Sequence, residues 1–254
     1  MPDFTDSVWT RPPRVARGEQ PTLSREQIVR AAIALLDAEG LAGLSMRKLG
    51  TSLGSGATSL YWYVATKDDL LELAIDEVMA EIYVPEAGDT SWRTGASVYA
   101  TSMRAALVRH PWVLGLLGTR PTFGPNAMRL GDRCVALLTH AGFSGMSVSY
   151  VGSLLSSHAI GSATTEAAFH HSAQRAGLTP AEMVGELEPY LSKVGAEYPV
   201  YDRWRRENGP AGPDPNSIME ATFAFGLDRI LDGLDQWRTT HPAEPSAPAT
   251  ADGG

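Results

Sequence analysis

The residues whose chemistry stands out lie in the stretch Ala57–Val64, which reads Ala-Thr-Ser-Leu-Tyr-Trp-Tyr-Val. Its apolar residues Ala57, Leu60 and Val64 are spaced to form one buried face of a short helix. Such a helix cannot bury all of its large aromatic side chains in a small domain, so most of them should face outward. Exposed hydroxyl and aromatic groups can bind DNA phosphates and contact thymine methyl groups. The candidates for these contacts are Thr58, Ser59, Tyr61, Trp62 and Tyr63.

The flanking sequence predicts the elements that would hold this surface. Residues 45–53 form a pattern typical of a short helix, and Gly54 and Gly56 then supply the backbone freedom that a tight turn between helices needs. Thr66 is placed to cap a further helix that begins at Lys67. Two short helices joined by a glycine-containing turn make a helix-turn-helix, whose second helix enters the DNA major groove. The alternative interpretation is an aromatic surface cluster that binds protein.

The ordered pattern Leu-Tyr-Trp-Tyr-Val-Ala-Thr-Lys-Asp-Asp-Leu-Leu, preceded by Leu-Ser-Met-Arg-Lys-Leu-Gly-Thr-Ser-Leu-Gly, resembles the DNA-binding domain of the tetracycline-repressor (TetR) family. The resemblance implies that Arg47 reads a base from the first of the two helices. It also implies that Thr58 and Ser59 begin the recognition helix. The same resemblance assigns groove and phosphate contacts to Tyr61, Trp62, Tyr63 and Lys67. Ala57 stands where tetracycline-binding members carry a base-reading glutamine, so the operator sequence should differ.

Length, charge and cysteine content limit the remaining possibilities. The chain has 254 residues, enough for one or two domains with a sizeable core. A net charge of −8 argues against broad electrostatic binding of nucleic acid, although it permits a local basic surface. The single cysteine, Cys134, excludes an internal disulfide and fits a reducing compartment. With no signal peptide and no long apolar run in the sequence, we expect a cytoplasmic protein.

Three common enzyme motifs are missing from the sequence, which contains no phosphate-binding loop, no dinucleotide glycine motif and no H-E-x-x-H. A regulator is therefore expected rather than an enzyme, with no cofactor and no metal site.

The predicted fold is all-α, with an N-terminal three-helix helix-turn-helix domain followed by a helical ligand-binding and dimerisation domain. Residues 1–22, with four prolines and no periodicity, are expected to be a mobile arm. The arm either only interacts with solvent or reaches a DNA minor groove through Arg11, Arg14 or Arg17. Residues 23–83 form the predicted DNA-binding domain, starting with a capping box at Ser24 and Gln27.

The second domain is predicted over residues 84–240, with a disordered tail at 241–254. Hydrophobic periodicity predicts long helices over residues 92–110, 127–140, 147–171 and 217–238, and Thr179-Pro180 begins another that ends near residue 197. The proline- and glycine-rich segment 198–216 is expected to be a loop. The motifs Leu-Gly-Thr-Arg-Pro-Thr at 117–122, Ala-Gly-Phe-Ser at 141–144 and Phe-x-x-Gly-Leu-x-x-Ile-Leu-x-Gly-Leu at 223–234 extend the TetR-family resemblance to about residues 24–238.

This resemblance implies a homodimer in which the helix over residues 147–171 and the last helix form a four-helix interface. A dimer also follows from DNA recognition, because one helix-turn-helix makes few base contacts and a two-fold dimer reads a palindrome with half-sites about 34 Å apart. The alternative is that the apolar last helix only closes the core of one subunit.

The predicted ligand-binding residues come from the same resemblance. Tetracycline-binding members carry a magnesium-binding histidine where this chain has Leu116, and their drug-gripping asparagine, phenylalanine and glutamine match Tyr99, Met103 and Cys134. These replacements predict a mostly hydrophobic organic effector instead of magnesium–tetracycline. The polar contacts expected for that effector are Thr119, Arg120, His158 and Glu166. His158 has the alternative of a hydrogen-bonded core histidine, and Glu166 that of a solvated face.

The sequence therefore predicts a repressor that binds an operator as a homodimer and releases it when a small molecule binds. A transcriptional activator of the same family and a helical module that binds no DNA are the alternatives. The family mechanism would transmit ligand binding through the helix that begins at Lys67.

Overall fold

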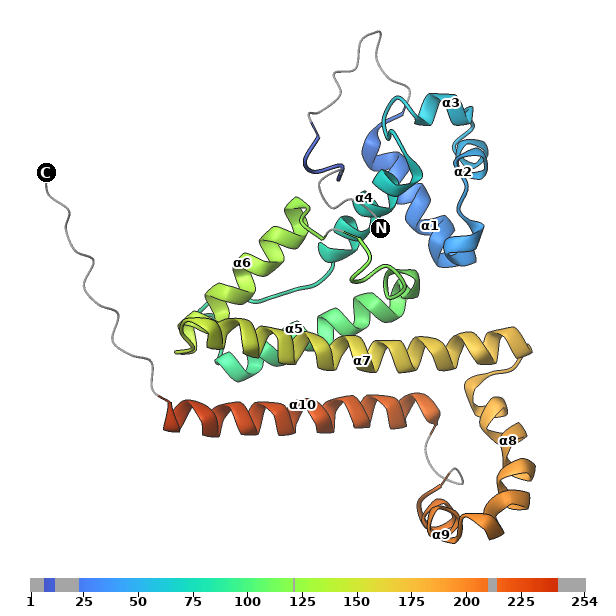
Figure 1. Cartoon of the computed structure of the whole chain (residues 1–254), viewed down its shortest axis with the longest axis vertical. Coiled ribbons are helices and arrows are strands. Elements are labelled where there is room, and N and C mark those ends of the chain that lie inside the picture. Colours follow the sequence, from blue (N-terminus) through green and yellow to red (C-terminus); the bar gives the residue numbers. More distant parts are fainter. Residues whose placement is uncertain (1–6, 12–22, 121, 210–213, 242–254) are drawn as a thin grey trace, which may run out of the picture.

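The computed structural model describes residues 7–11, 23–120, 122–209 and 214–241, and every regular element in these ranges is helical (Figure 1). The N-terminal helices are α1 (Arg25–Gly43), α2 (Met46–Ser52), α3 (Ala57–Leu60) and α4 (Lys67–Met79). The second part contains α5 (Trp92–Arg109), the 3₁₀ turn η1 (Pro111–Val113), α6 (Pro125–His140) and α7 (Met146–Ala176). It ends with α8 (Pro180–Val194), η2 (Gly195–Glu197), α9 (Pro199–Asn208) and α10 (Pro215–Thr240). The predicted all-α fold is confirmed.

Side-chain caps fix the starts of the N-terminal helices. Ser24 and Gln27 form the predicted capping box of α1, and the Thr66 hydroxyl accepts the Asp69 amide at 3.0 Å at the start of α4. Gly54, with a φ of 64°, makes the turn after α2. Gly50 allows close approach in this turn, because an added Cβ there would lie 2.8 Å from the Ser55 carbonyl oxygen.

The recognition helix is shorter than the predicted residues 57–64. Regular α-helix ends at Leu60, and the chain then continues through tighter turns in which the Trp62 amide donates to the Ser59 carbonyl and the Tyr63 amide to the Leu60 carbonyl. Helix α4 ends at Met79, and the chain after it also continues in tighter turns.

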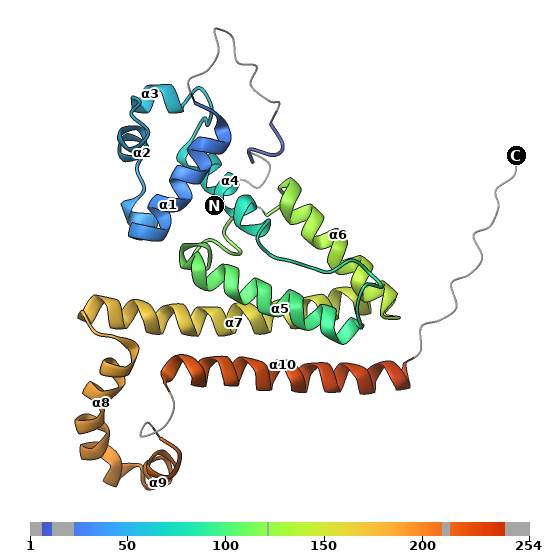
Figure 2. The ribbon, with the colours of Figure 1, turned by 180° about the vertical axis from the view of Figure 1, so that it is seen from behind.

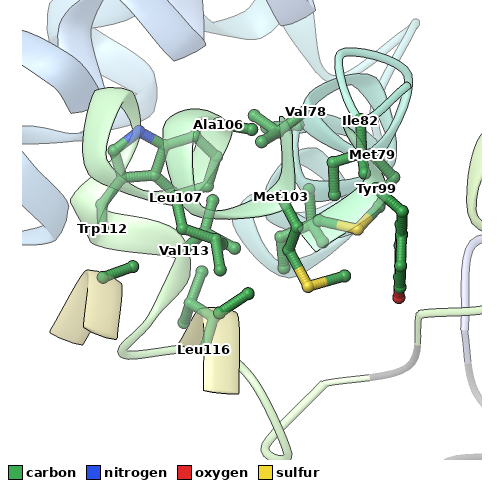
Figure 3. Close-up of a cluster of buried hydrophobic side chains, with 14 of the residues drawn as sticks. Val78, Met79, Ile82, Tyr99, Met103, Ala106, Leu107, Trp112, Val113 and Leu116 are labelled. Atoms are coloured by element: carbon green, nitrogen blue, oxygen red, sulfur yellow. The ribbon is translucent and has the colours of Figure 1, made fainter. Parts of the chain in front are cut away.

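A continuous apolar core joins the two parts of the molecule. Figure 3 shows side chains from the end of α4, from α5 and from the segment around η1 meeting in one buried cluster. The cluster connects α5 to the DNA-binding unit, since the end of α4 contributes side chains to it and η1, which contacts α5, also contacts α1. The labelled members of the cluster are Val78, Met79, Ile82, Tyr99, Met103, Ala106, Leu107, Trp112, Val113 and Leu116.

Helices α7 and α10 run side by side along one edge of the molecule, as Figures 1 and 2 both show. Leu155 and Ala159 of α7 and Leu231 of α10 face inward and are buried. Both helices also carry exposed large apolar side chains, which favours contact with a partner. These are Tyr150, Leu154, Ile218 and Phe225.

The expectation that residues 198–216 form a loop is wrong for its first half, which is helix α9. Pro199 occupies the first turn, where a missing amide hydrogen costs nothing, so it starts the helix instead of breaking it. Asp202 then bonds Arg205 and Arg206 within α9, and Arg205 also donates to Glu188 of α8 at 2.6 and 2.7 Å. Helices α8 and α9 therefore form one arm, which extends from the far ends of α7 and α10 (Figure 1).

The N-terminal arm also differs from its prediction where it is described. Arg11 forms an ion pair with Asp69 of α4, and Ser7 is buried against the same helix. Residues 7–11 therefore contact the DNA-binding unit instead of extending away from it. Arg14 and Arg17 lie outside the described residues.

Across the described ranges, none of the helices is both long and apolar enough to cross a membrane.

Candidate nucleic-acid interface and ligand cleft

The surface predicted to contact DNA is held by two buried residues. Leu60 and Val64 are almost completely buried in the core of the N-terminal unit, so the helix and turn that carry them have a fixed orientation. The side chains between them face outward, with Tyr61 44 % and Trp62 79 % exposed. Thr58, Ser59 and the α2 residue Arg47 are also exposed. This arrangement can present hydroxyl, indole and guanidinium groups to one groove of DNA.

Two of the residues predicted to contact DNA make contacts inside the protein instead. Tyr63 is half-buried and packs against the core. The Lys67 ammonium donates to the Leu44 carbonyl at 2.7 Å and lies 3.5 Å from the Leu41 carbonyl. Lys67 thereby satisfies carbonyls that the end of α1 leaves unpaired and fixes the start of α4 against that helix.

A cleft of about 620 Å³ opens between α5, α6 and the first half of α7. Tyr99 and Cys134, from the predicted ligand-binding set, lie together in its wall. Apolar side chains of α6 and α7 and hydroxyls of α7 complete the lining. Among the described lining residues none is charged: Tyr99, Cys134, Val135, Leu138, Thr139, Gly145, Val148, Ser149, Gly152, Ser153 and Ser156. A cleft with this lining fits an uncharged, largely apolar molecule with a few oxygen atoms.

Burial controls the protonation of both Tyr99 and Cys134. Desolvation raises the pKa of the Cys134 thiol to about 11, although the hydrogen bond with Tyr99 acts in the opposite direction. The pKa of the Tyr99 hydroxyl is also raised, first by desolvation and then by the neighbouring Cys134. Both groups are therefore neutral near pH 7, and the Tyr99 hydroxyl donates to the sulfur.

The other residues predicted to bind ligand do not line this cleft. Met103 and Leu116 are buried in the apolar cluster of Figure 3. The Thr119 hydroxyl donates to the Leu116 carbonyl at 2.9 Å, and Arg120 pairs with Asp68 of α4 at 2.9 Å. Through this ion pair Arg120 connects the loop before α6 to the DNA-binding unit.

His158 and Glu166 line a separate groove of about 420 Å³ between α7 and α10. The His158 ring shares a hydrogen bond of 2.9 Å with the Phe223 carbonyl and stacks on the Phe223 ring at 5.0 Å. Glu166 pairs with Arg104 at 2.6 Å, and the Arg104 guanidinium lies 4.9 Å above the same ring. These contacts join α5, α7 and α10, so both residues act as packing groups at this position.

A polar junction that the sequence analysis missed connects the two parts of the chain. The buried ring of His110, at the end of α5, has Asp37 of α1 at 2.7 Å from Nδ1 and Glu81 at 3.0 Å from Nε2. Each ring nitrogen therefore lies within hydrogen-bonding distance of a carboxylate from a different part of the chain. Asp37 also accepts the Trp112 indole at 2.7 Å. The sequence signal was present, because His110 falls on the apolar stripe of its helix.

Comparison with known proteins decides the family. The family profile described as "Bacterial regulatory proteins, tetR family" matches residues 28–74, and "Tetracyclin repressor-like, C-terminal domain" matches residues 84–238. The chain belongs to the TetR family of transcriptional regulators. TetR-family proteins regulate transcription and are not enzymes.

Three relatives illustrate the similarity. An HTH-type transcriptional regulator of Saccharopolyspora erythraea is 40 % identical over 76 % of this chain and 79 % of its own length. The HTH-type transcriptional repressor DrrR1 of Streptomyces coeruleorubidus is 36 % identical over 90 % of this chain and 83 % of its own. The crystal structure of the TetR-family protein ActR from Streptomyces coelicolor in complex with actinorhodin superimposes with a TM-score of 0.67, at 29 % identity over 84 % of this chain and 96 % of that one.

Proposed function

We propose that this TetR-family regulator is a homodimeric repressor that binds a palindromic operator and releases it when an uncharged, largely apolar polycyclic compound occupies the cleft. The observation that carries the proposal is the pairing of the exposed Arg47–Trp62 surface with the 620 Å³ neutral cleft in one chain. The relatives support it, because DrrR1 is named as a repressor and ActR binds actinorhodin.

Dimerisation is supported by the exposed face of α7 and α10. Tyr150, Leu154 and Phe225 are large apolar side chains on helices that are otherwise well packed. A second copy with the same face would bury them in a self-complementary contact. Such a dimer can place two recognition helices about one DNA turn apart, roughly 34 Å, which matches the half-sites of a palindrome.

The effector class follows from the cleft lining. Val135, Leu138 and Val148 provide apolar walls, and the hydroxyls of Ser149 and Ser153 provide positions for hydrogen bonds. No magnesium chelate is expected, since Leu116 has no ligand atom and lies in the apolar cluster. A flat compound with carbonyl or hydroxyl groups along one edge fits these requirements.

The DNA-binding part is tested by gel shift with fragments from upstream of the protein's own gene and its neighbours. Arg47→Ala and Tyr61→Ala should each weaken operator binding by about 5- to 150-fold, because a good base or groove contact contributes roughly 1–3 kcal/mol. Tyr83→Ala is the matched control, since Tyr83 is also an exposed tyrosine, at 57 %, but follows α4 instead of lying in the recognition segment. Equal binding by the parent and both test variants would rule out this DNA-binding surface.

Release of the operator by an effector is tested by adding actinorhodin to the protein–operator complex first, and then other polycyclic polyketides. Gly152→Leu should abolish release while preserving operator binding, because a Cβ at Gly152 has only a Leu138 methyl group at 3.8 Å nearby and a larger side chain would fill the cleft. In vitro transcription from the same fragment then distinguishes a repressor from an activator. If Gly152→Leu still responds like the parent, the effector binds elsewhere.

A further inference from the structure

The described N-terminal residues Ser7–Arg11 are held on α4 by several polar contacts. The Ser7 hydroxyl donates to a Glu72 carboxylate oxygen at 2.5 Å, and the Val8 amide donates to the same oxygen at 3.1 Å. Arg11 pairs with Asp69 one turn earlier on the helix. The segment also has internal order, since the Thr10 amide donates to the Ser7 carbonyl at 3.1 Å.

These contacts provide hydrogen-bond and ion-pair partners for a row of buried carboxylates that would otherwise destabilise the folded protein. Asp69, Glu72 and Asp76 lie three and four residues apart on one face of α4, and they are only 4 %, 6 % and 5 % exposed. A buried carboxylate without partners strongly destabilises a protein. Asp69 and Glu72 obtain partners from the segment Ser7–Arg11.

The third carboxylate connects α4 to the helix that lines the cleft. Asp76 accepts the amides of Asn126 and Ala127, in the first turn of α6, at 3.2 and 2.9 Å. It replaces the missing cap of this helix, because the N-cap residue Gly124 has no side chain to provide one. The same α6 carries Cys134 in the cleft wall.

Trp9 places the N-terminal segment against the contact between Asp76 and the start of α6. A Cβ added to Gly124 would lie 2.3 Å from the Asp76 carboxyl and 2.6 Å from the Trp9 ring, so these three residues are in close contact. The segment therefore contacts both α4, through Glu72 and Asp69, and the start of α6, through Trp9.

We propose that Ser7–Arg11 is a strap that holds α4 against the start of α6 and opposes movement of the DNA-binding unit when the cleft is occupied. This inference rests on the effector release proposed above. Turning α4 relative to α6 would separate the strap either from Asp69 and Glu72 on α4 or, through Trp9, from Gly124 at the start of α6, so the strap stabilises the described arrangement. An effector must overcome that preference before the operator is released.

Hydrogen exchange measured by mass spectrometry on the DNA-free protein tests the strap directly. Two truncations are compared, one lacking residues 1–6 and one lacking residues 1–11, so that only the second loses the strap. Peptides of α4 and of the first turn of α6 should exchange about tenfold faster in the longer truncation. Peptides of α7 and α10 should be unchanged, and the shorter truncation should match the parent.

A point variant separates the ion pair from the loss of chain length. Arg11→Gln should accelerate exchange in α4, whereas Arg175→Gln, which changes an exposed arginine at the end of α7, should not. Equal exchange in both truncations would overturn the strap. Faster exchange throughout the protein would also overturn it, because the segment would then support general stability without linking two helices.

Operator release tests the regulatory half of the proposal. With actinorhodin as the probe, half-release should need about tenfold less compound for the longer truncation than for the shorter one. An unchanged or higher requirement would refute the restraint on release. If neither actinorhodin nor the other polycyclic polyketides release the parent or any variant, the proposed ligand class is wrong, and the exchange measurement alone decides the strap.

Discussion

The Cys134 thiol gives a direct chemical test of the cleft. It is the single cysteine of the chain, so alkylation by iodoacetamide reports on one atom. The ordinary thiol pKa of 9.0 is raised to about 11 by desolvation. At pH 8 this shift of 11 − 9 = 2 pKa units lowers the fraction of reactive thiolate about 100-fold.

Part of this loss is recovered, because a thiolate of higher pKa is a stronger nucleophile. A Brønsted slope of about 0.4–0.5 over the same shift gives back roughly sixfold to tenfold. The folded protein should therefore react about 10 to 16 times more slowly than the urea-unfolded protein at pH 8, and hindered access to the cleft would slow it further. Tyr99→Phe should slow the reaction again, since it removes the hydrogen bond that lowers the thiol pKa.

The assay follows alkylation by intact mass from pH 7 to pH 10. In the folded protein the rate should rise steadily over the whole range, whereas in urea it should reach half its maximum near pH 9 and flatten toward pH 10. A folded-state rate that flattens toward pH 10, or one equal to the unfolded rate at pH 8, would show that Cys134 is solvated and that the described cleft wall is wrong.

Four further predictions concern stability and assembly. The folded state raises the pKa of Cys134, so the stabilisation from its buried neutral thiol is fully present below pH 9. The free energy of unfolding should fall between pH 9 and pH 11 by up to about 2.7 kcal/mol. Urea melts at pH 9 and pH 11 should show a smaller loss for Cys134→Ala. Leu155→Ala removes a side chain that is 1 % exposed and should cost about 2–5 kcal/mol of unfolding free energy. The neighbouring residue Leu154 is 45 % exposed, so Leu154→Ala should instead lower dimer affinity in sedimentation experiments. A dimer unaffected by Leu154→Ala would exclude the proposed dimer contact through α7 and α10. Gly50→Ala should lower the melting temperature, since its Cβ would lie 2.8 Å from the Ser55 carbonyl, whereas Gly56→Ala has open space and should not.

Much of the fold could be predicted because its signals are local. The capping residues Ser24 and Thr66 stand within three residues of the amides that they bind, and the apolar stripe of α5 repeats along one helix. Helix α9 could not be recognised in the same way. Its decisive contact is between Arg205 and Glu188, seventeen residues apart, and Pro199 looked like a helix breaker.

The same difference between local signals and long-range contacts decides which candidate site residues could be predicted. The outward position of Tyr61 and Trp62 follows from the burial of their neighbours, which periodicity reveals. A charged residue such as Arg120 or Glu166 instead looks available for a ligand in the sequence, but each has found a carboxylate or guanidinium elsewhere in the chain. Periodicity does not show which partner a charge will find in space.

The small size of α3 has a consequence for how this protein can change over evolutionary time. Leu60 and Val64 are the buried anchors of the recognition segment, and Ala57 and Tyr63 pack against the same core, while Thr58, Ser59 and Trp62 are exposed. Exposed positions that contact no core residue accept substitution at little cost in stability. Mutations can therefore alter the preferred operator without first weakening the fold, so a duplicated gene could acquire a new target while its ligand response stays intact.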